Sequence, residues 1–158
     1  MTTRDIAGYN FHDVTSNIKR MIDESVLDPK VRELAIEIVG QSDDPIASIY
    51  DWVKEKVTYV SDPIDVELIT SPIRMVNDYR DGKQLAEDCD GHALFVTALL
   101  KSVGINAKVA ILDIKGFGWD HAVTVAYSDK LGKWIFVDTT SEKPLGWVEK
   151  YKSRFDVE

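Results

Sequence analysis

Hydrophobic positions in the first half of the chain recur at helical spacing, and prolines mark where several helices begin. Residues 14–26 carry apolar side chains at intervals of three or four. Two Asp-Pro pairs and one Ser-Pro pair then each place a capping side chain before a proline that suits the first helical turn. The pattern predicts four helices, over 14–26, 29–40, 45–57 and 72–77. An extended segment is expected at 58–60, and a turn is expected at Asp81-Gly82.

The second half opens with a longer apolar segment, after which the spacing changes. Apolar residues after Cys89 follow a near-helical register as far as Val103, and Gly104 suits a left-handed cap. Three segments rich in β-branched or aromatic residues follow, and they predict strands over 107–114, 121–127 and 133–138. The loop SDKLGK should join the last two strands as a hairpin. Helices followed by antiparallel strands predict an α+β fold in which the helix starting at Cys89 is central and packs on the sheet.

Composition narrows the class of protein. A chain of 158 residues with 44% hydrophobic content fits one compact domain, 1–158. Its 19 basic and 27 acidic side chains give a net charge of −8, which repels nucleic-acid phosphates and anionic membrane surfaces. No apolar run approaches the roughly 20 residues needed to cross a bilayer. One cysteine and an N-terminus without signal-peptide features predict a reducing, cytoplasmic setting with neither nucleic acid nor membrane as partner.

The single cysteine is the main candidate for chemistry. Cys89 stands between two aspartates at the predicted start of the central helix. Unpaired backbone N–H groups and the helix dipole stabilise a thiolate there, and the same N–H groups could face a developing oxyanion. The competing interpretation is an inert thiol in the hydrophobic core. The segment DCDGH also contains metal-ligand types, but it lacks the second thiol or paired histidines typical of structural zinc, so no metal or cofactor is expected.

An activated thiol needs a base, and two histidines compete for that role. His121 opens a predicted strand, whereas His92 lies in the same helix as Cys89, where side chains lean toward the N-terminus and do not easily cross the front of the thiol. His121 is therefore preferred over His92 as the base. Asp138 ends the next strand, so an antiparallel hairpin should bring it beside His121, where a carboxylate could orient the imidazole. The plainer alternative is that Asp138 only begins a turn.

Three segments carry a resemblance to a known family: residues 71–114, DHAVTVAY, and KWIFVDTTSEKPLGW. They resemble the transglutaminase-like superfamily of papain-fold cysteine enzymes, in a short form similar to bacterial and phage members. The resemblance covers about 44–147 and leaves about 1–43 as an N-terminal helical extension. It implies that Cys89 is the nucleophile, His121 the base and Asp138 its orienting carboxylate. The implied activity is acyl chemistry on peptide or protein amides, ending in hydrolysis or in transfer to an amine.

Other residues near the proposed trio carry weaker expectations. Many members of the resembled family have glycine two residues before the cysteine, whereas this chain has Glu87. Gln84 could correspond to the upstream side-chain amide that donates to the oxyanion in papain-type enzymes, or it could be a solvated loop residue. Trp119 and Phe117 could wall a substrate cleft, or they could belong to the rim of the core. The alternative function is a catalytically inactive module that keeps the fold and binds peptide or protein partners.

Overall fold

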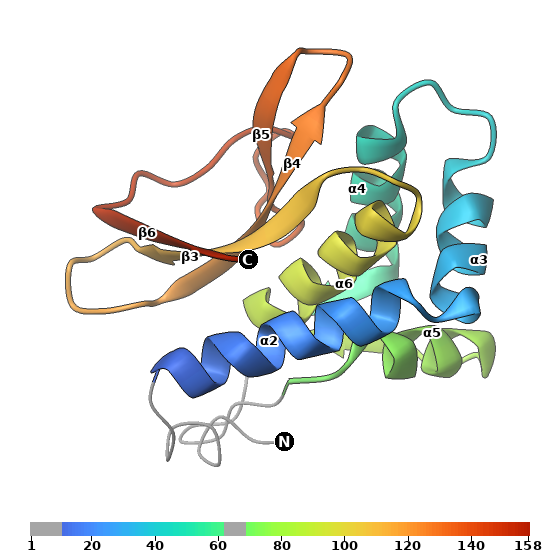
Figure 1. The fold of residues 1–158 in the computed structure, drawn as a ribbon, viewed down its shortest axis with the longest axis horizontal. Helices are drawn as coiled ribbons and strands as arrows, with labels where there is room; N and C mark the ends of the chain where they lie inside the picture. The colour runs from blue at the N-terminus through green and yellow to red at the C-terminus, as the bar shows by residue number, and fades with distance from the viewer. Residues whose placement is uncertain (1–10, 62–68) are drawn as a thin grey trace.

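A computed structural model describes residues 11–61 and 69–158 (Figure 1). The helices are α2 (Phe11–Val26), α3 (Pro29–Val39), α4 (Pro45–Lys56), α5 (Pro72–Arg80) and α6 (Cys89–Ser102). The strands are β1 (Val57–Tyr59), β2 (Leu85–Glu87), β3 (Ala107–Asp113), β4 (His121–Ser128), β5 (Lys133–Val137) and β6 (Ser153–Val157).

The helices begin where the proline pairs predict. The side chains of the three caps, Asp28, Asp44 and Ser71, each accept a hydrogen bond from a backbone N–H two or three residues later. Each following proline occupies the first turn, where its missing N–H costs no hydrogen bond. Local capping chemistry therefore sets the starts of α3, α4 and α5.

Two helix boundaries differ from the prediction by three residues. Helix α2 begins at Phe11 rather than at residue 14. Helix α5 continues to Arg80 instead of ending near residue 77, and its last turn makes two tertiary contacts. The Tyr79 ring packs edge-on against Trp52 with 5.0 Å between ring centroids, and Arg80 forms an ion pair with Glu37 of α3. The predicted turn follows directly, with Gly82 at a φ of 79°.

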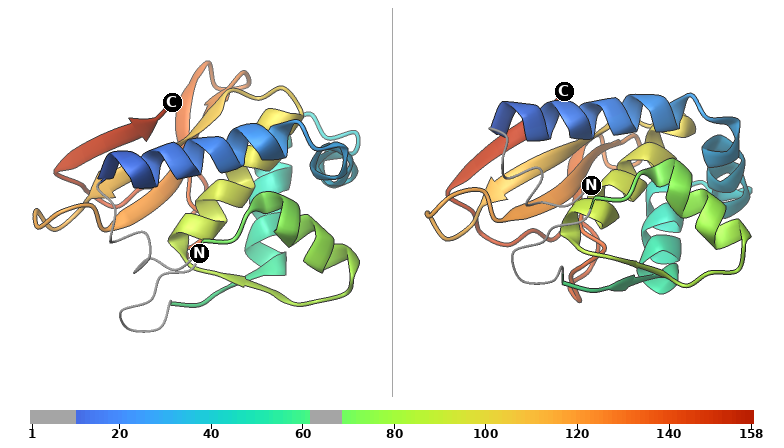
Figure 2. Two further views of the ribbon diagram at one scale, coloured as in Figure 1. Left: turned by 60° about the horizontal axis from the view of Figure 1, so that its bottom comes forward. Right: turned by 90° about the horizontal axis from the view of Figure 1, so that it is seen from below.

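Helix α6 is the central element of the fold. Every residue from Gly91 to Leu100 is buried, with the sheet on one side of the helix and α3, α4 and α5 on the other (Figures 1 and 2). The Thr124 hydroxyl donates to the Ala93 carbonyl at 3.0 Å and shares a 2.9 Å hydrogen bond with the Thr97 hydroxyl, which joins β4 to the helix. The expectation of a central, buried helix beginning at Cys89 and packed on an antiparallel sheet is confirmed.

The main sheet has the strand order β5-β4-β3-β6, and all of its neighbouring strands are antiparallel. Strands β4 and β5 form the predicted hairpin, in which Ser128 pairs with Lys133. Two strands were not predicted. Strand β6 adds to the free side of β3, and the short β2 pairs in parallel with β1 just before α6 begins. The pairing of β1 with β2 anchors the chain immediately upstream of Cys89.

Helix α2 crosses the molecule alongside α6 and reaches from α3 to the β6 side of the sheet (Figure 2). Its inward face contributes Ile18, Met21 and Ile22 to a hydrophobic cluster that also includes Ala93, and Cys89 packs against this cluster. The N-terminal helices therefore pack directly on the helix that carries the thiol. Within 11–61 and 69–158, no helix is long and apolar enough to cross a membrane.

Candidate active site

The N-terminus of α6 holds the thiol. Cys89 is the first helical residue and is partly exposed. The buried carboxylate of Asp88 caps the helix by accepting from the Gly91 N–H at 3.2 Å. The Cys89 sulfur also makes a weak contact with Asp90 Oδ1 at 3.9 Å. A thiolate at this position gains from the positive end of the helix dipole, which lowers the cost of ionising the sulfur.

The residue two positions before the thiol folds over the same first turn. A Cβ atom placed on Gly91 would lie 2.7 Å from the Cβ of Glu87, closer than real side chains approach. The Glu87 carboxylate accepts a hydrogen bond from the Thr70 hydroxyl at 3.2 Å, which holds the side chain in place. Glu87 and Gly91 therefore fit together as a pair, and a larger residue at position 91 would displace the Glu87 side chain.

His121 and Asp138 meet where β4 begins and β5 ends. Thr124 is paired with Val137, so the same register places Asp138 opposite Val123, two residues from His121 and on the same side of β4. The Nε2 atom of His121 lies 2.9 Å from Oδ2 of Asp138. The two side chains are largely shielded from solvent, with 18% and 6% of their areas exposed. The hairpin thus brings two of the three predicted catalytic residues into direct contact.

Burial and pairing act on this ion pair in opposite directions. Burial alone lowers the His121 pKa, but the hydrogen bond to Asp138 and the negative charges of Asp138 and Asp90 outweigh it, so the pKa is raised above its ordinary 6.5. Burial alone raises the Asp138 pKa, but hydrogen bonds from His121 and Thr140 outweigh it, and the pKa is lowered. Asp138 Oδ1 accepts from the Thr140 N–H at 2.9 Å and from its hydroxyl at 2.6 Å. The pair therefore favours an imidazolium beside a carboxylate.

The first turn of α6 lies close to the end of β5. Thr139, the residue after Asp138, places its Oγ1 2.7 Å from Nδ1 of His92 in that first turn. The charge of Asp90, the neighbour of Cys89, raises the His121 pKa, so the thiol's own turn is within electrostatic reach of the imidazole. The thiol-bearing helix end and the His121–Asp138 pair thus belong to one region of the molecule.

His92, the rival base in the sequence, has a different environment. Only 2% of the residue is exposed, and burial lowers its pKa to about 4, although the Thr58 carbonyl and the Asp138 charge act in the opposite direction. The ring is therefore neutral near pH 7 and closed to solvent. Sequence reasoning did not single out its partner Thr139, nor Thr140, which holds Asp138. The signal available was the pair of hydroxyl residues directly after a strand-terminal aspartate.

Gln84 and Trp119 occupy positions at the edges of this region. The exposed Gln84 precedes β2, and its side-chain nitrogen lies 3.3 Å from the Thr58 hydroxyl oxygen and 3.4 Å from the Lys56 carbonyl. The Trp119 ring stacks on Phe11 at 5.2 Å between centroids. A role for Gln84 at the oxyanion and for Trp119 in substrate binding stays a prediction.

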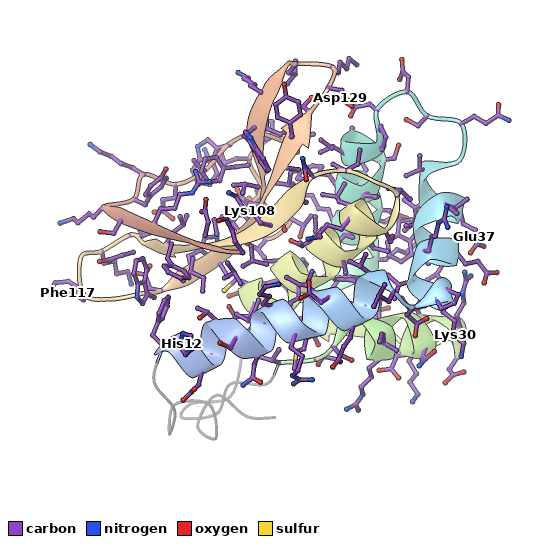
Figure 3. All side chains as sticks on the ribbon, viewed as in Figure 1. His12, Lys30, Glu37, Lys108, Phe117 and Asp129 are labelled. Atoms are coloured by element: carbon purple, nitrogen blue, oxygen red, sulfur yellow. The ribbon has the colours of Figure 1, made fainter. Side chains whose placement is uncertain are left out.

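Two further expectations concern the loop before His121 and metal binding. Phe117 is 94% exposed and points outward from the β3–β4 loop, so its ring is not part of the core rim (Figure 3). Over 11–61 and 69–158, no group of three or more His, Cys, Asp or Glu side chains is placed to hold a metal ion.

The fold defines an α+β protein whose central helix starts at a cysteine and packs on an antiparallel sheet. The family model of the transglutaminase-like superfamily matches residues 32–139, and the chain belongs to that superfamily. Membership supports a function of the general cysteine-enzyme type. The division into an N-terminal extension and a core from 44 to 147 stays a prediction.

Solved structures share this fold. One is a protein of Parabacteroides distasonis provisionally assigned as a protease, with a TM-score of 0.63 and 12% identity over 82% of this chain. Another is a protein of Cytophaga hutchinsonii provisionally assigned as a cysteine protease, with a TM-score of 0.53 and 24% identity over 70% of this chain. The chain spans 26% and 37% of the lengths of these two proteins. No curated protein matches the chain.

Proposed function

We propose that this protein is a cysteine-dependent enzyme that carries out acyl chemistry on peptide or protein amides, with Cys89 as nucleophile, His121 as base and Asp138 as orienting carboxylate. The observation that carries the proposal is the 2.9 Å contact between His121 Nε2 and Asp138 Oδ2 at the sheet end nearest the start of α6. Superfamily membership supports the same assignment.

The proposed reaction has two stages. The Cys89 thiolate attacks the carbonyl carbon of the amide, the C–N bond breaks, and the leaving amine takes a proton from the His121 imidazolium. The resulting thioester is then attacked by water or by a second amine, which transfers its proton to His121. The products are a carboxylic acid or a new amide, and the thiolate is restored. The acceptor decides between hydrolysis and acyl transfer.

The two ring nitrogens of His121 have separate roles in this scheme. Asp138 contacts Nε2, so Nδ1 is the nitrogen that would exchange a proton with the sulfur. The carboxylate fixes the tautomer and stabilises the positive imidazolium. Backbone N–H groups at the start of α6, with the Gln84 amide as a further candidate, would stabilise the oxyanion. A reducing cytoplasmic setting, in which the thiol stays active, is proposed with this chemistry.

The ionisation state of Cys89 tests the proposal. An ordinary thiol with a pKa of about 8.5 is only roughly 0.3% thiolate at pH 6. A thiolate–imidazolium pair would instead react with iodoacetamide at pH 6 with little loss of rate, and His121→Ala should slow that reaction by about tenfold or more. Mass spectrometry of tryptic peptides locates the label on Cys89.

A matched histidine variant separates a specific effect from a general one. His12→Ala removes an exposed histidine from the first turn of α2 and should leave the alkylation profile unchanged (Figure 3). If Cys89 is alkylated only near the ordinary thiol pKa, and equally fast after His121→Ala, the thiol is not activated. That outcome would favour the alternative of a non-catalytic module that binds peptides.

A further inference from the structure

A buried polar side chain that takes no part in the proposed proton transfer lies one helical turn from the thiol. His92 follows Cys89 by three residues on α6 and is 2% exposed. Among the described residues, its buried Nε2 atom makes no hydrogen bond of normal geometry, although the Thr58 carbonyl lies near enough to raise the His92 pKa. A buried polar atom without a good hydrogen bond lowers the stability of the folded state. An apolar side chain of similar size would avoid that cost. The presence of a histidine at this position therefore points to a role for its other ring nitrogen, Nδ1.

That other nitrogen joins α6 to the end of β5. Nδ1 of His92 lies 2.7 Å from Oγ1 of Thr139, and the hydrogen bond is buried on both sides. Thr139 lies in the turn that follows β5. Its side chain contacts helix α6 through His92, while that of its neighbour Asp138 contacts His121.

The three residues from Asp138 to Thr140 each hold a different part of the site. Asp138 contacts His121 at 2.9 Å, Thr139 contacts His92 at 2.7 Å, and Thr140 donates twice to Asp138. A single peptide unit separates the His92 contact from the His121 contact. The position of the first turn of α6 is thereby tied to the position of the imidazole.

We propose that His92 is a positioning residue, and that its hydrogen bond to Thr139 sets the spacing between the Cys89 sulfur and the His121–Asp138 pair. This inference rests on the proposed function, because it concerns the same thiol. His92 does not touch substrate, since it is closed to solvent, and it acts as a neutral ring. A displacement of about 1 Å between reacting groups can lower a rate by up to about 100-fold.

The experiment breaks the hydrogen bond between His92 and Thr139 by substituting either partner. Each disrupting variant is compared with a conservative variant that can still form the bond. Thr139→Val replaces the hydroxyl with a methyl group of similar size, and His92→Leu removes the nitrogen. Both should lower the rate of Cys89 alkylation at pH 6 by about tenfold or more, and shift the pH profile toward that of an ordinary thiol. Thr139→Ser and His92→Asn each keep a group able to form the bond, and both should stay within about threefold of the parent rate.

A control on the same helix distinguishes positioning from stability. Thr97→Val removes a different buried hydrogen bond of α6, the 2.9 Å hydroxyl–hydroxyl contact with Thr124, two turns from the thiol. It should lower the urea midpoint of unfolding about as much as Thr139→Val, but leave the alkylation profile unchanged. Equal effects of Thr97→Val and Thr139→Val on alkylation would overturn the proposal.

The variants distinguish a failure of the positioning role of His92 from a failure of the proposed function. If His121→Ala slows alkylation and the Thr139→Val and His92→Leu variants do not, the positioning role is wrong and the proposed function stands. If His121→Ala has no effect, the proposed function itself fails. Should one disrupting variant not fold, the other tests the same bond from the opposite partner.

Discussion

Replacing Asp138 by asparagine tests the electrostatic core of the candidate site. Asparagine keeps the shape of the side chain, and its carbonyl oxygen can still accept the two hydrogen bonds from Thr140. Its amide nitrogen would then face Nε2 of His121, which forces the ring proton onto Nδ1. That tautomer cannot take a proton from the thiol through Nδ1. The substitution also removes the charge that raises the His121 pKa, so the pKa should fall.

The size of the effect follows from the contact that is lost. His121 and Asp138 are 18% and 6% exposed, so solvent screens their 2.9 Å hydrogen bond only slightly. A hydrogen bond to a charged group contributes about 1.5–3 kcal/mol. If the bond stabilises the thiolate–imidazolium pair by this amount, Asp138→Asn should slow alkylation of Cys89 at pH 6 by roughly 10- to 150-fold. The rate is measured with iodoacetamide between pH 5 and 9.

The control is Asp156→Asn. Asp156 is also partly buried in ion pairs, with Lys108 at 3.1 Å and Arg154 at 2.6 Å, but it lies on β6. Its substitution should change stability without changing the alkylation profile. If Asp138→Asn reacts at the parent rate across the whole pH range, the carboxylate does not orient or charge the imidazole, and the reasoning about the pair is wrong.

The pair should also make stability depend on pH. The His121 pKa is raised, so its contribution is complete below 6.5 and is lost as the pH rises through the folded-state pKa. The Asp138 pKa is lowered, so its contribution is present above 3.8 and is lost as the pH falls through the folded-state pKa. The difference in unfolding free energy between the parent and Asp138→Asn should therefore be largest between pH 3.8 and 6.5. Urea unfolding at pH 5 and pH 9 measures it, and a larger difference at pH 9 would contradict the assignment.

Three further predictions concern the first turn of α6. Gly91→Ala should destabilise the fold by about 1–3 kcal/mol in urea unfolding, because the new Cβ would lie 2.7 Å from the Cβ of Glu87. Alanine usually stabilises a helix relative to glycine, so a gain in stability would refute this prediction. Asp88→Ala should cost about 1 kcal/mol through loss of the cap, whereas Asp88→Ser should largely keep it, and equal losses would argue against capping. In NMR titrations, His92 should stay neutral from pH 8 to pH 5, because burial lowers its pKa to about 4; a midpoint near 6.5 would contradict the described environment.

The sequence predicts best where the determinants are local. Proline and capping residues fix the starts of three helices within a few positions, and the apolar run after Cys89 marks the central helix. β-Branched and aromatic residues likewise mark β3, β4 and β5. In each case the signal lies inside the element itself, so no knowledge of the tertiary fold is needed.

The elements that escaped prediction depend on distant partners. In β6 the first three residues are exposed and Val157 is the only buried one, so its sequence carries little strand signal, and it forms by pairing with β3 far earlier in the chain. The contact between His92 and Thr139 joins residues 47 positions apart. It depends on how closely α6 approaches the end of β5, which the packing of the whole core decides.

The single hairpin that carries both His121 and Asp138 makes their meeting sensitive to strand length but not to loop length. A residue inserted into or deleted from β4 or β5 would slide one strand by a step and turn the carboxylate to the opposite side of the sheet. Residues added at the tip, between Ser128 and Lys133, would leave that register intact. A reporter peptide or an affinity handle is therefore best grafted at the tip, because Ser128 lies seven residues along β4 from His121, at roughly 3.4 Å per residue.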